Sequence, residues 1–301
     1  MKEAASARKP VLRRETLGLV SGFIGVVIFG GTLPATRLAL DGFSPAFITF
    51  GRGALAALLA AIALAVLRRP LPGREMPKLL LAGLMLVFGF PLLSSVGLQT
   101  VPAAHGGVVL GILPMTTSIF AALFGGERPS PLFWLCGLSG AVLVVTFAMR
   151  DGAGMTLTFG DMALFLACVA ASTGYVASGV LSRRMPGWEV ICWALVLTAP
   201  VSVVGALLSA PAEWPAWQDP ALWGFAYLAG GSMFLGFFFW NVGLGLGGIA
   251  RVSQVQLLQT FVTLAIAATL LGEHISAETL TFALAVVVVV ALARRARVSR
   301  R

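Results

Sequence analysis

Long, almost uncharged apolar runs dominate this sequence and decide what it can fold into. A helix that crosses a hydrocarbon core of about 30 Å needs about 20 apolar residues. Ten segments meet this requirement: 17–38, 44–67, 78–99, 102–124, 131–149, 160–182, 188–210, 220–242, 248–271 and 277–294. Hydrophobic residues make up 58% of the chain and charged residues 11%, which no ordinary soluble fold could cover with polar surface. The sequence predicts an all-α membrane protein with ten transmembrane helices.

The basic residues indicate how these spans are oriented. The net charge is +9, and all but three of the 21 lysines and arginines lie in the two terminal tails or near the turns that follow even-numbered spans. The exceptions are Arg37, Arg52 and Arg150. Because cytoplasmic loops carry the excess of basic residues, we expect both termini in the cytoplasm and a multi-pass protein of the bacterial inner membrane. The positive charge is not interpreted as a nucleic-acid-binding surface.

An internal repeat divides the chain into two halves. Val-Gly-Leu occurs at 96–98 and at 242–244, and Gly-Glu at 126–127 and at 272–273, so both pairs are 146 residues apart. The repeat predicts one unit in residues 1–150 and a second in 151–301. Because each unit has five spans, an odd number, the second enters the membrane upside down. Inverted repeats are characteristic of secondary transporters, whose substrate site lies near mid-membrane where the copies face each other.

Specific residues extend this pattern to a family resemblance. They are the two Gly-Glu turns, Phe-Gly-Arg at 50–52 and Leu-Pro at 113–114. With them the chain resembles the EamA-type group of the drug/metabolite transporter superfamily over nearly its whole length. Trp-Asn-Val-Gly at 240–243 further resembles the YddG-type exporters of aromatic amino acids. The resemblance implies ten helices around a central cavity and the export of amino acids or related metabolites. One departure is Thr260, which stands where the repeat would place a partner for Pro114.

The sequence gives little support for an enzymatic function. Gly137-Leu138-Ser139-Gly140 is similar to the serine motif of intramembrane proteases, but a serine nucleophile needs a nearby base, and the two histidines, His105 and His274, lie near span ends. Helix packing through small residues explains the motif better. Three cysteines, Cys136, Cys168 and Cys192, match no metal or disulfide spacing. We therefore predict no catalytic residues, no metal and no cofactor. An intramembrane enzyme acting on lipid or peptide and a non-transporting scaffold are the alternatives from other functional classes.

Two charged features allow both a structural and a functional interpretation. Glu127 and Glu273 stand just ahead of the fifth and tenth spans, where a carboxylate can accept the free N–H groups at a helix start; a gating role is the alternative. Arg52 is the one cation in the interior of a predicted span. A charge in hydrocarbon must meet water, a carbonyl or an anion, so Arg52 either pairs with backbone carbonyls or reaches water as a structural arginine, or it binds a substrate carboxylate.

Polar residues on the ninth span predict the substrate cavity. Gln256, Gln259, Thr260 and Thr263 share one helix face by their spacing of i, i+3, i+4 and i+7. Such groups either bond neighbouring helices together or line a wet cavity. We expect further substrate contacts from the fourth, sixth and eighth spans, namely from His105, Pro114, Ser172, Tyr175, Trp240 and Asn241. Trp240 would stack on an aromatic substrate or anchor its helix at the membrane interface.

The sequence thus predicts a secondary transporter that exports small neutral metabolites, amino acids including aromatic ones, by alternating access between the repeats. An efflux carrier for drugs or other metabolites with the same fold is the alternative within the family. No acidic residue lies deep in a predicted span, since Asp161 and Glu189 fall at span edges; this favours a facilitator or an exchanger. The expected partners are the small-molecule substrate and membrane lipid, and we expect a monomer.

Overall fold

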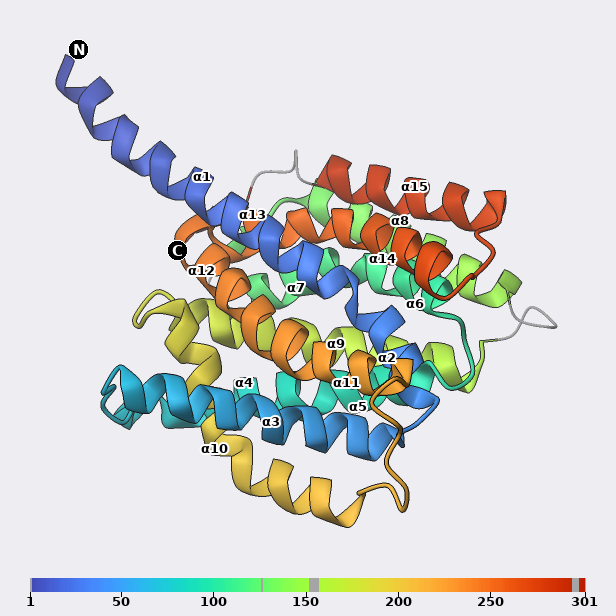
Figure 1. Cartoon of the computed structure of the whole chain (residues 1–301). Helices are drawn as coiled ribbons and strands as arrows, with labels where there is room; N and C mark the ends of the chain where they lie inside the picture. The colour runs from blue at the N-terminus through green and yellow to red at the C-terminus, as the bar shows by residue number, and fades with distance from the viewer. Residues whose placement is uncertain (1, 126, 152–156, 294–297, 301) are drawn as a thin grey trace.

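The computed structural model describes residues 2–125, 127–151, 157–293 and 298–300. They form a bundle of helices that run roughly alongside one another, with most connections at its two ends (Figure 1). We call one end the Glu273 end, which holds Asp41, Pro102 and Glu273. The opposite end, where Arg184 bonds Glu75, is called the Glu75 end.

The first half of the chain supplies five spans, most of them interrupted. In order, its elements are α1 (Lys2–Gly30), α2 (Thr32–Leu40), α3 (Pro45–Val66), η1 (Gly73–Glu75), α4 (Met76–Gly83), η2 (Leu84–Gly89), α5 (Phe90–Gly97), α6 (Ala103–Val109), η3 (Leu110–Ile112), α7 (Leu113–Phe124), β1 (Glu127–Pro129) and α8 (Pro131–Asp151).

The second half repeats this arrangement. Its elements are α9 (Phe159–Leu181), α10 (Gly187–Leu208), α11 (Pro220–Ala226), η4 (Tyr227–Gly236), α12 (Phe237–Gly247), α13 (Ile249–Ser253), η5 (Gln254–Gln256), α14 (Leu257–Leu270), α15 (Ala277–Ala293) and β2 (Val298–Arg300). The strands β1 and β2 form one short antiparallel ladder, which joins the C-terminal residues to the turn after α7.

The predicted ten-span architecture agrees with these helices. Among the described residues, seven helices are long and apolar enough to cross a membrane, and two shorter apolar helices cover Leu258–Leu270 and Ala277–Val289. The helix α8, with 21 residues, accounts for the remaining predicted span. Large apolar side chains such as Leu58, Leu135 and Leu207 are exposed on the outside, as a lipid-facing surface requires. The chain is therefore an all-α membrane protein, apart from the one short ladder.

The spans are interrupted at matching depths in the two halves. In the third span the π-helical segment η2 precedes Pro91, and in the fourth span the 3-10 turn η3 precedes Pro114. A proline lacks the N–H that would continue the helical ladder, so the turn before it rearranges. The eighth and ninth spans contain a π-helical segment and a 3-10 turn at closely corresponding positions, η4 and η5. Their breaks therefore do not depend on a proline at the same place.

Close contact between α1 and α12 holds the two halves together through glycine. A Cβ added to Gly18 would meet Gly247 at 2.5 Å, and one added to Gly243 of α12 would meet the backbone of Gly22 at 2.9 Å. Gly25 likewise lies against the backbone of Trp240. The helices approach this closely because no side chain separates them, which is how small residues drive packing in membranes.

Candidate functional site

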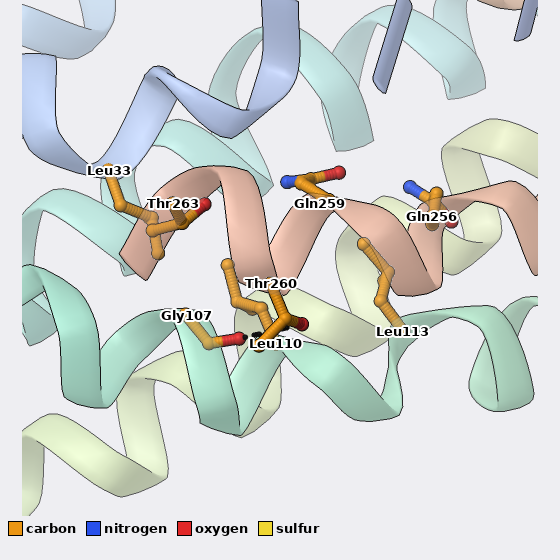
Figure 2. A pocket seen from close by; sticks show the side chains of 8 residues that line it. All are labelled: Leu33, Gly107, Leu110, Leu113, Gln256, Gln259, Thr260 and Thr263. Atoms are coloured by element: carbon orange, nitrogen blue, oxygen red, sulfur yellow. Dashed lines mark hydrogen bonds between the residues drawn. The ribbon is translucent and has the colours of Figure 1, made fainter. Parts of the chain in front are cut away.

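A small pocket lies near the middle of the bundle, where the broken fourth and ninth spans face each other. Its volume is about 10 Å³, and it is lined by Leu33, Gly107, Leu110, Leu113, Gln256, Gln259, Thr260 and Thr263 (Figure 2). The structure therefore brings the four polar residues of the ninth span to one surface, opposite the fourth span. Because this volume holds about one water molecule, the site is closed in this conformation. Substrate binding by these residues stays a prediction.

The two threonines on this surface bond neighbouring helices. The Thr260 hydroxyl donates to the Gly107 carbonyl at 3.3 Å, as drawn in Figure 2. The Thr263 hydroxyl donates to the Gly30 carbonyl at 2.9 Å, which is freed by the break between α1 and α2. These contacts match the helix-bonding interpretation of the polar face.

The two glutamines behave differently from the threonines. Gln256 is buried, and its amide nitrogen and oxygen make no hydrogen bond of ordinary geometry among the described residues; its side chain approaches only the Tyr175 hydroxyl loosely. The Oε1 atom of Gln259 has none in this part of the chain either. Buried amide groups without partners are costly, so these two side chains are poised to bond water or substrate.

Aromatic residues from both halves gather beside Gln256. The Tyr175 hydroxyl lies next to the Gln256 side chain, and the Tyr175 ring is 5.3 Å from the ring of Trp240, centroid to centroid. Phe29 contacts Trp240 at 6.0 Å and Phe237 at 4.9 Å. Trp240 is 0% exposed and its indole Nε1 has no partner among the described residues. It is therefore a core residue and not an interfacial anchor.

Asn241 is also buried next to Trp240 in the chain. It is 0% exposed, and both of its amide atoms lack partners within the described residues. Its backbone lies against Gly187 at the start of α10, at the Glu75 end of the bundle. Its part in a substrate site stays a prediction.

Three other predicted residues lie outside the central pocket. The Ser172 hydroxyl bonds Thr116 at 2.7 Å, joining α9 to α7. The Pro114 carbonyl accepts from Ser118 at 2.8 Å, while its neighbour Leu113 reaches the pocket. His105 points to a different partner, described next. The helix period alone places these residues near the centre but cannot say which of them face the pocket.

His105 and Asp161 form a buried pair between the fourth and sixth spans. The His105 Nε2 and Asp161 Oδ1 atoms are 2.7 Å apart, and the two residues are 4% and 0% exposed. The other carboxylate oxygen accepts from the N–H and the hydroxyl of Thr158, which caps α9. Asp161 stands at a span edge as expected, but helix packing removes it from solvent and ties it to the other half of the chain.

Glu273 corrects the expectation that each Gly-Glu turn caps the helix after it. Its two carboxylate oxygens accept the N–H groups of Ala103 and Ala104, at 2.9 and 2.8 Å. It therefore caps the fourth span, at the start of α6, and not its own α15. Gly272, in a left-handed conformation with φ of 66°, allows the sharp turn that aims Glu273 across the bundle. The side chain of Glu127 lies outside the described residues.

A funnel opens beside this cap at the Glu273 end. It has a volume of about 540 Å³ and is lined by Arg37, Leu38, Asp41, Gln99, Thr100, Val101, Pro102, Leu270, Leu271 and Glu273. Arg37 is held by a hydrogen bond to the Leu98 carbonyl at 2.8 Å. The helices α2 and α14 line both the funnel and the central pocket. The funnel and the central pocket therefore lie along the same two helices at different depths.

The serine of the motif that is similar to intramembrane proteases has a structural role. The Ser139 hydroxyl donates to the Leu135 carbonyl of its own helix on an exposed face.

Comparisons with known proteins agree with this architecture. The model of the EamA-like transporter family matches residues 16–149 and again 158–295. The chain belongs to the EamA-like transporter family. "Uncharacterized transporter YdeK" of Bacillus subtilis is 42% identical over 285 residues, which cover 94% of this chain and 99% of that protein.

Two further proteins are similar to this EamA-like chain at lower sequence identity. The "Probable terminal-alkyne amino-acid exporter" of Streptantibioticus cattleyicolor is 30% identical over 174 residues, covering 56% of this chain and 57% of that protein. A solved crystal structure matches with a TM-score of 0.70 over 94% of this chain and 99% of that one, at 21% identity. This last likeness concerns the fold alone.

Proposed function

We propose that this EamA-like chain is a secondary transporter that exports small neutral metabolites, most readily amino acids including aromatic ones. The observation that carries the proposal is the meeting of two broken spans around Gln256 and Gln259, where both amide atoms of Gln256 and the Oε1 atom of Gln259 make no hydrogen bond of ordinary geometry among the described residues. Discontinuous helices that meet near mid-membrane are the usual construction of a transporter site. The family's transporter function, in place of an enzymatic one, points the same way.

The chemistry of the central residues suits a zwitterion with an apolar side chain. A glutamine amide can donate to a carboxylate and accept from an ammonium group. The neighbouring rings of Tyr175, Trp240 and Phe237 offer a surface on which an aromatic or aliphatic side chain can pack. The relative named as an amino-acid exporter supports this substrate class. An efflux carrier for drugs or other metabolites would use the same rings without needing the amides.

The sizes of the two cavities support a mechanism of alternating access. The centre is closed at about 10 Å³, whereas the Glu273 end opens into about 540 Å³. Rocking of one repeat against the other would widen the centre toward either end.

The orientation of the chain in the membrane is inferred from its basic residues. Arg68, Arg69, Arg74, Arg183 and Arg184 all lie at the Glu75 end of the described chain, which would face the cytoplasm. The termini would then be cytoplasmic and the funnel would open to the periplasm. We expect a monomer in the inner membrane, in contact with lipid and with its small-molecule substrate.

A flux experiment tests the proposal. The full chain is reconstituted in liposomes, and uptake of a panel of radiolabelled amino acids is measured with and without a pH gradient. Saturable uptake of one or more amino acids above that of empty liposomes is expected. Uptake of none of them, with uptake of lipophilic dyes, would assign the protein to drug efflux instead.

Cysteine labelling tests whether the ninth span lines the pathway. Cysteines are introduced singly at 256, 259, 260 and 263, with position 258 as the matched control because Leu258 is 45% exposed on the apolar outside. A membrane-impermeant thiol reagent should label the first four positions, and substrate should slow that labelling. Equal reaction at position 258, or no protection anywhere, would contradict the proposed pathway.

A further inference from the structure

Arg52 is the most unusual buried charge in the described part of the protein. It lies within α3, is 1% exposed, and its Nε and Nη1 atoms have no hydrogen-bond partner among the described residues. None of the ion pairs seen between described residues includes it. The expected pairing of this arginine with backbone carbonyls is therefore not what the structure shows.

Arg52 lies on a helix, α3, that packs against α5 and η2 of the first half and against α10 and η4 of the second. Next to it in α3, Gly51 packs against Phe225, and Gly53 packs against Ser202 of α10 and Val87 of η2. Arg52 itself interacts electrostatically with Tyr175 of α9, in the second half. Tyr175, which lies next to the Gln256 side chain, is thus the group through which Arg52 is related electrostatically to the central surface.

A cation in this position needs an anion. A charged side chain within a membrane span is strongly unfavourable unless it meets water, a carbonyl or an opposite charge. Arginine presents its donors as a planar fork that matches a carboxylate, and such bidentate pairs are among the strongest hydrogen bonds in proteins. The other arginines with described contacts are already bonded: Arg37 to a carbonyl, Arg69 to Glu189 and Arg184 to Glu75.

We propose that Arg52 binds the carboxylate of the transported molecule, so that the substrates are compounds with a free carboxylate and an apolar or aromatic side chain. The side chain would pack against Tyr175 and Trp240, and the Gln256 amide would bond the remaining polar groups of the substrate. A zwitterionic amino acid meets all of these requirements and remains neutral overall. The inference rests on the proposed transport of amino acids and adds the group by which they are recognised.

The closed centre agrees with a site that forms on opening. The pocket beside Gln256 has room for about one water molecule, so a substrate enters only when the repeats separate. Arg52 would then supply a charge to a centre whose other unbonded polar groups, the Gln256 amide and the Trp240 indole N–H, are uncharged.

The test compares each amino acid with its amide. Phenylalanine and leucine are compared with phenylalaninamide and leucinamide, which keep the side chain and the amine but lack the carboxylate. Transport into liposomes containing the wild-type chain should favour each acid over its amide by about 10- to 100-fold, the usual range for a charge-assisted bond. In Arg52→Gln the rate for the acids should fall to that for the amides, whose own rate should change little.

Two further variants complete the design. Arg52→Lys keeps the charge but not the planar fork and should lose about 10-fold in acid transport. Arg184→Gln removes an exposed arginine paired with Glu75 and should keep the full preference for the acids. The wild-type comparison and Arg52→Lys decide the question even where Arg52→Gln does not assemble.

The outcomes separate the two proposals. If the wild-type chain carries no amino acid at all, the proposed function fails. If it carries amino acids but carries their amides equally well, only the role of Arg52 is overturned. An equal loss for acids and amides in both Arg52 variants would likewise overturn it, because a purely structural arginine acts on all substrates alike.

Discussion

The Glu273 end and the centre of this transporter treat their buried polar groups in opposite ways. At the Glu273 end, the carboxylates of Asp161 and Glu273 have partners at 2.7 to 2.9 Å in distant parts of the chain. At the centre, Arg52, Trp240 and Gln256 are buried with polar atoms that lack partners among the described residues. If the proposed site is right, hydrogen-bond satisfaction, and not burial alone, distinguishes its polar groups from structural ones.

The difference predicts opposite results for mutations at the two places. Removing a bonded group leaves its partners unsatisfied and lowers stability. Removing an unbonded group relieves an unfavourable burial and leaves stability unchanged or higher, while any function of that group is lost. The four predictions that follow test this contrast in order of decreasing expected effect.

Asp161→Ala should give the largest loss of stability. The change removes the hydrogen-bond partner of His105 Nε2 and the acceptor of both Thr158 donors. A hydrogen bond to a charged group contributes about 1.5–3 kcal/mol, so losing all of these bonds should cost at least about 3 kcal/mol. Thermal or denaturant unfolding of the purified protein measures it. Asp219→Ala, which removes only the cap of the peripheral helix α11, is the control and should cost about 1 kcal/mol. If the two variants lose equal stability, the buried His105–Asp161 pair contributes no more than a peripheral helix cap.

Glu273→Gln should give the next largest loss. The amide keeps one acceptor but turns the other toward an N–H group as a donor, so one of the two bonds to Ala103 and Ala104 is lost. A hydrogen bond to a charged group contributes about 1.5–3 kcal/mol. Glu213→Gln, in an exposed loop, should change stability by less than about 0.5 kcal/mol. If Glu273→Gln leaves stability unchanged, the two halves are not joined through this cap.

Gln256→Leu should separate activity from stability. Since neither amide atom is bonded within the described chain, the unfolding temperature should stay the same or rise. Transport of the best amino-acid substrate should fall about 10-fold, the equivalent of about 1.4 kcal/mol. Gln218→Leu, in an exposed loop, should alter neither quantity. A large loss of stability with normal transport would show that Gln256 is a structural residue and would contradict this prediction.

Thr263→Val should have the smallest effect. It removes the hydroxyl that bonds Gly30 between helices, and such bonds contribute about 0.6 kcal/mol in membrane proteins. Thr281 bonds only its own helix, at the Ala277 carbonyl, so Thr281→Val should change the free energy of unfolding less. Paired unfolding curves of the two variants measure the difference, and the reverse order would contradict it.

The sequence predicts the architecture well because the membrane imposes it. Apolar run length sets the spans, and the repeat at 146 residues relates the halves. The spacing of Gln256, Gln259, Thr260 and Thr263 places them on one face, which the structure brings to one pocket. What spacing cannot show is which of them is bonded, because the acceptors Gly107 and Gly30 become available only where other helices break.

The sequence could not predict the partners across the bundle either, because they depend on how distant helices pack. Glu273 stands ahead of α15, so local reasoning assigns it to that helix, yet its partners lie 170 and 169 residues away. His105 and Asp161 are 56 residues apart and meet only because α6 packs against α9. The one available signal was the duplication of Gly-Glu, since a turn kept in both copies suggests a contact between the copies.

The carboxylate of Glu273 also bears on how such a protein could have arisen. It belongs to one half of the chain, whereas the helix start that it caps belongs to the other. A solitary five-helix ancestor would have had a bare helix start and an unmatched acid at its surface. Two antiparallel copies of it could have satisfied each other, so assembly from a pair of separate short chains would precede gene fusion. Residues 1–150 and 151–301, produced as two polypeptides, should still associate into the complete carrier.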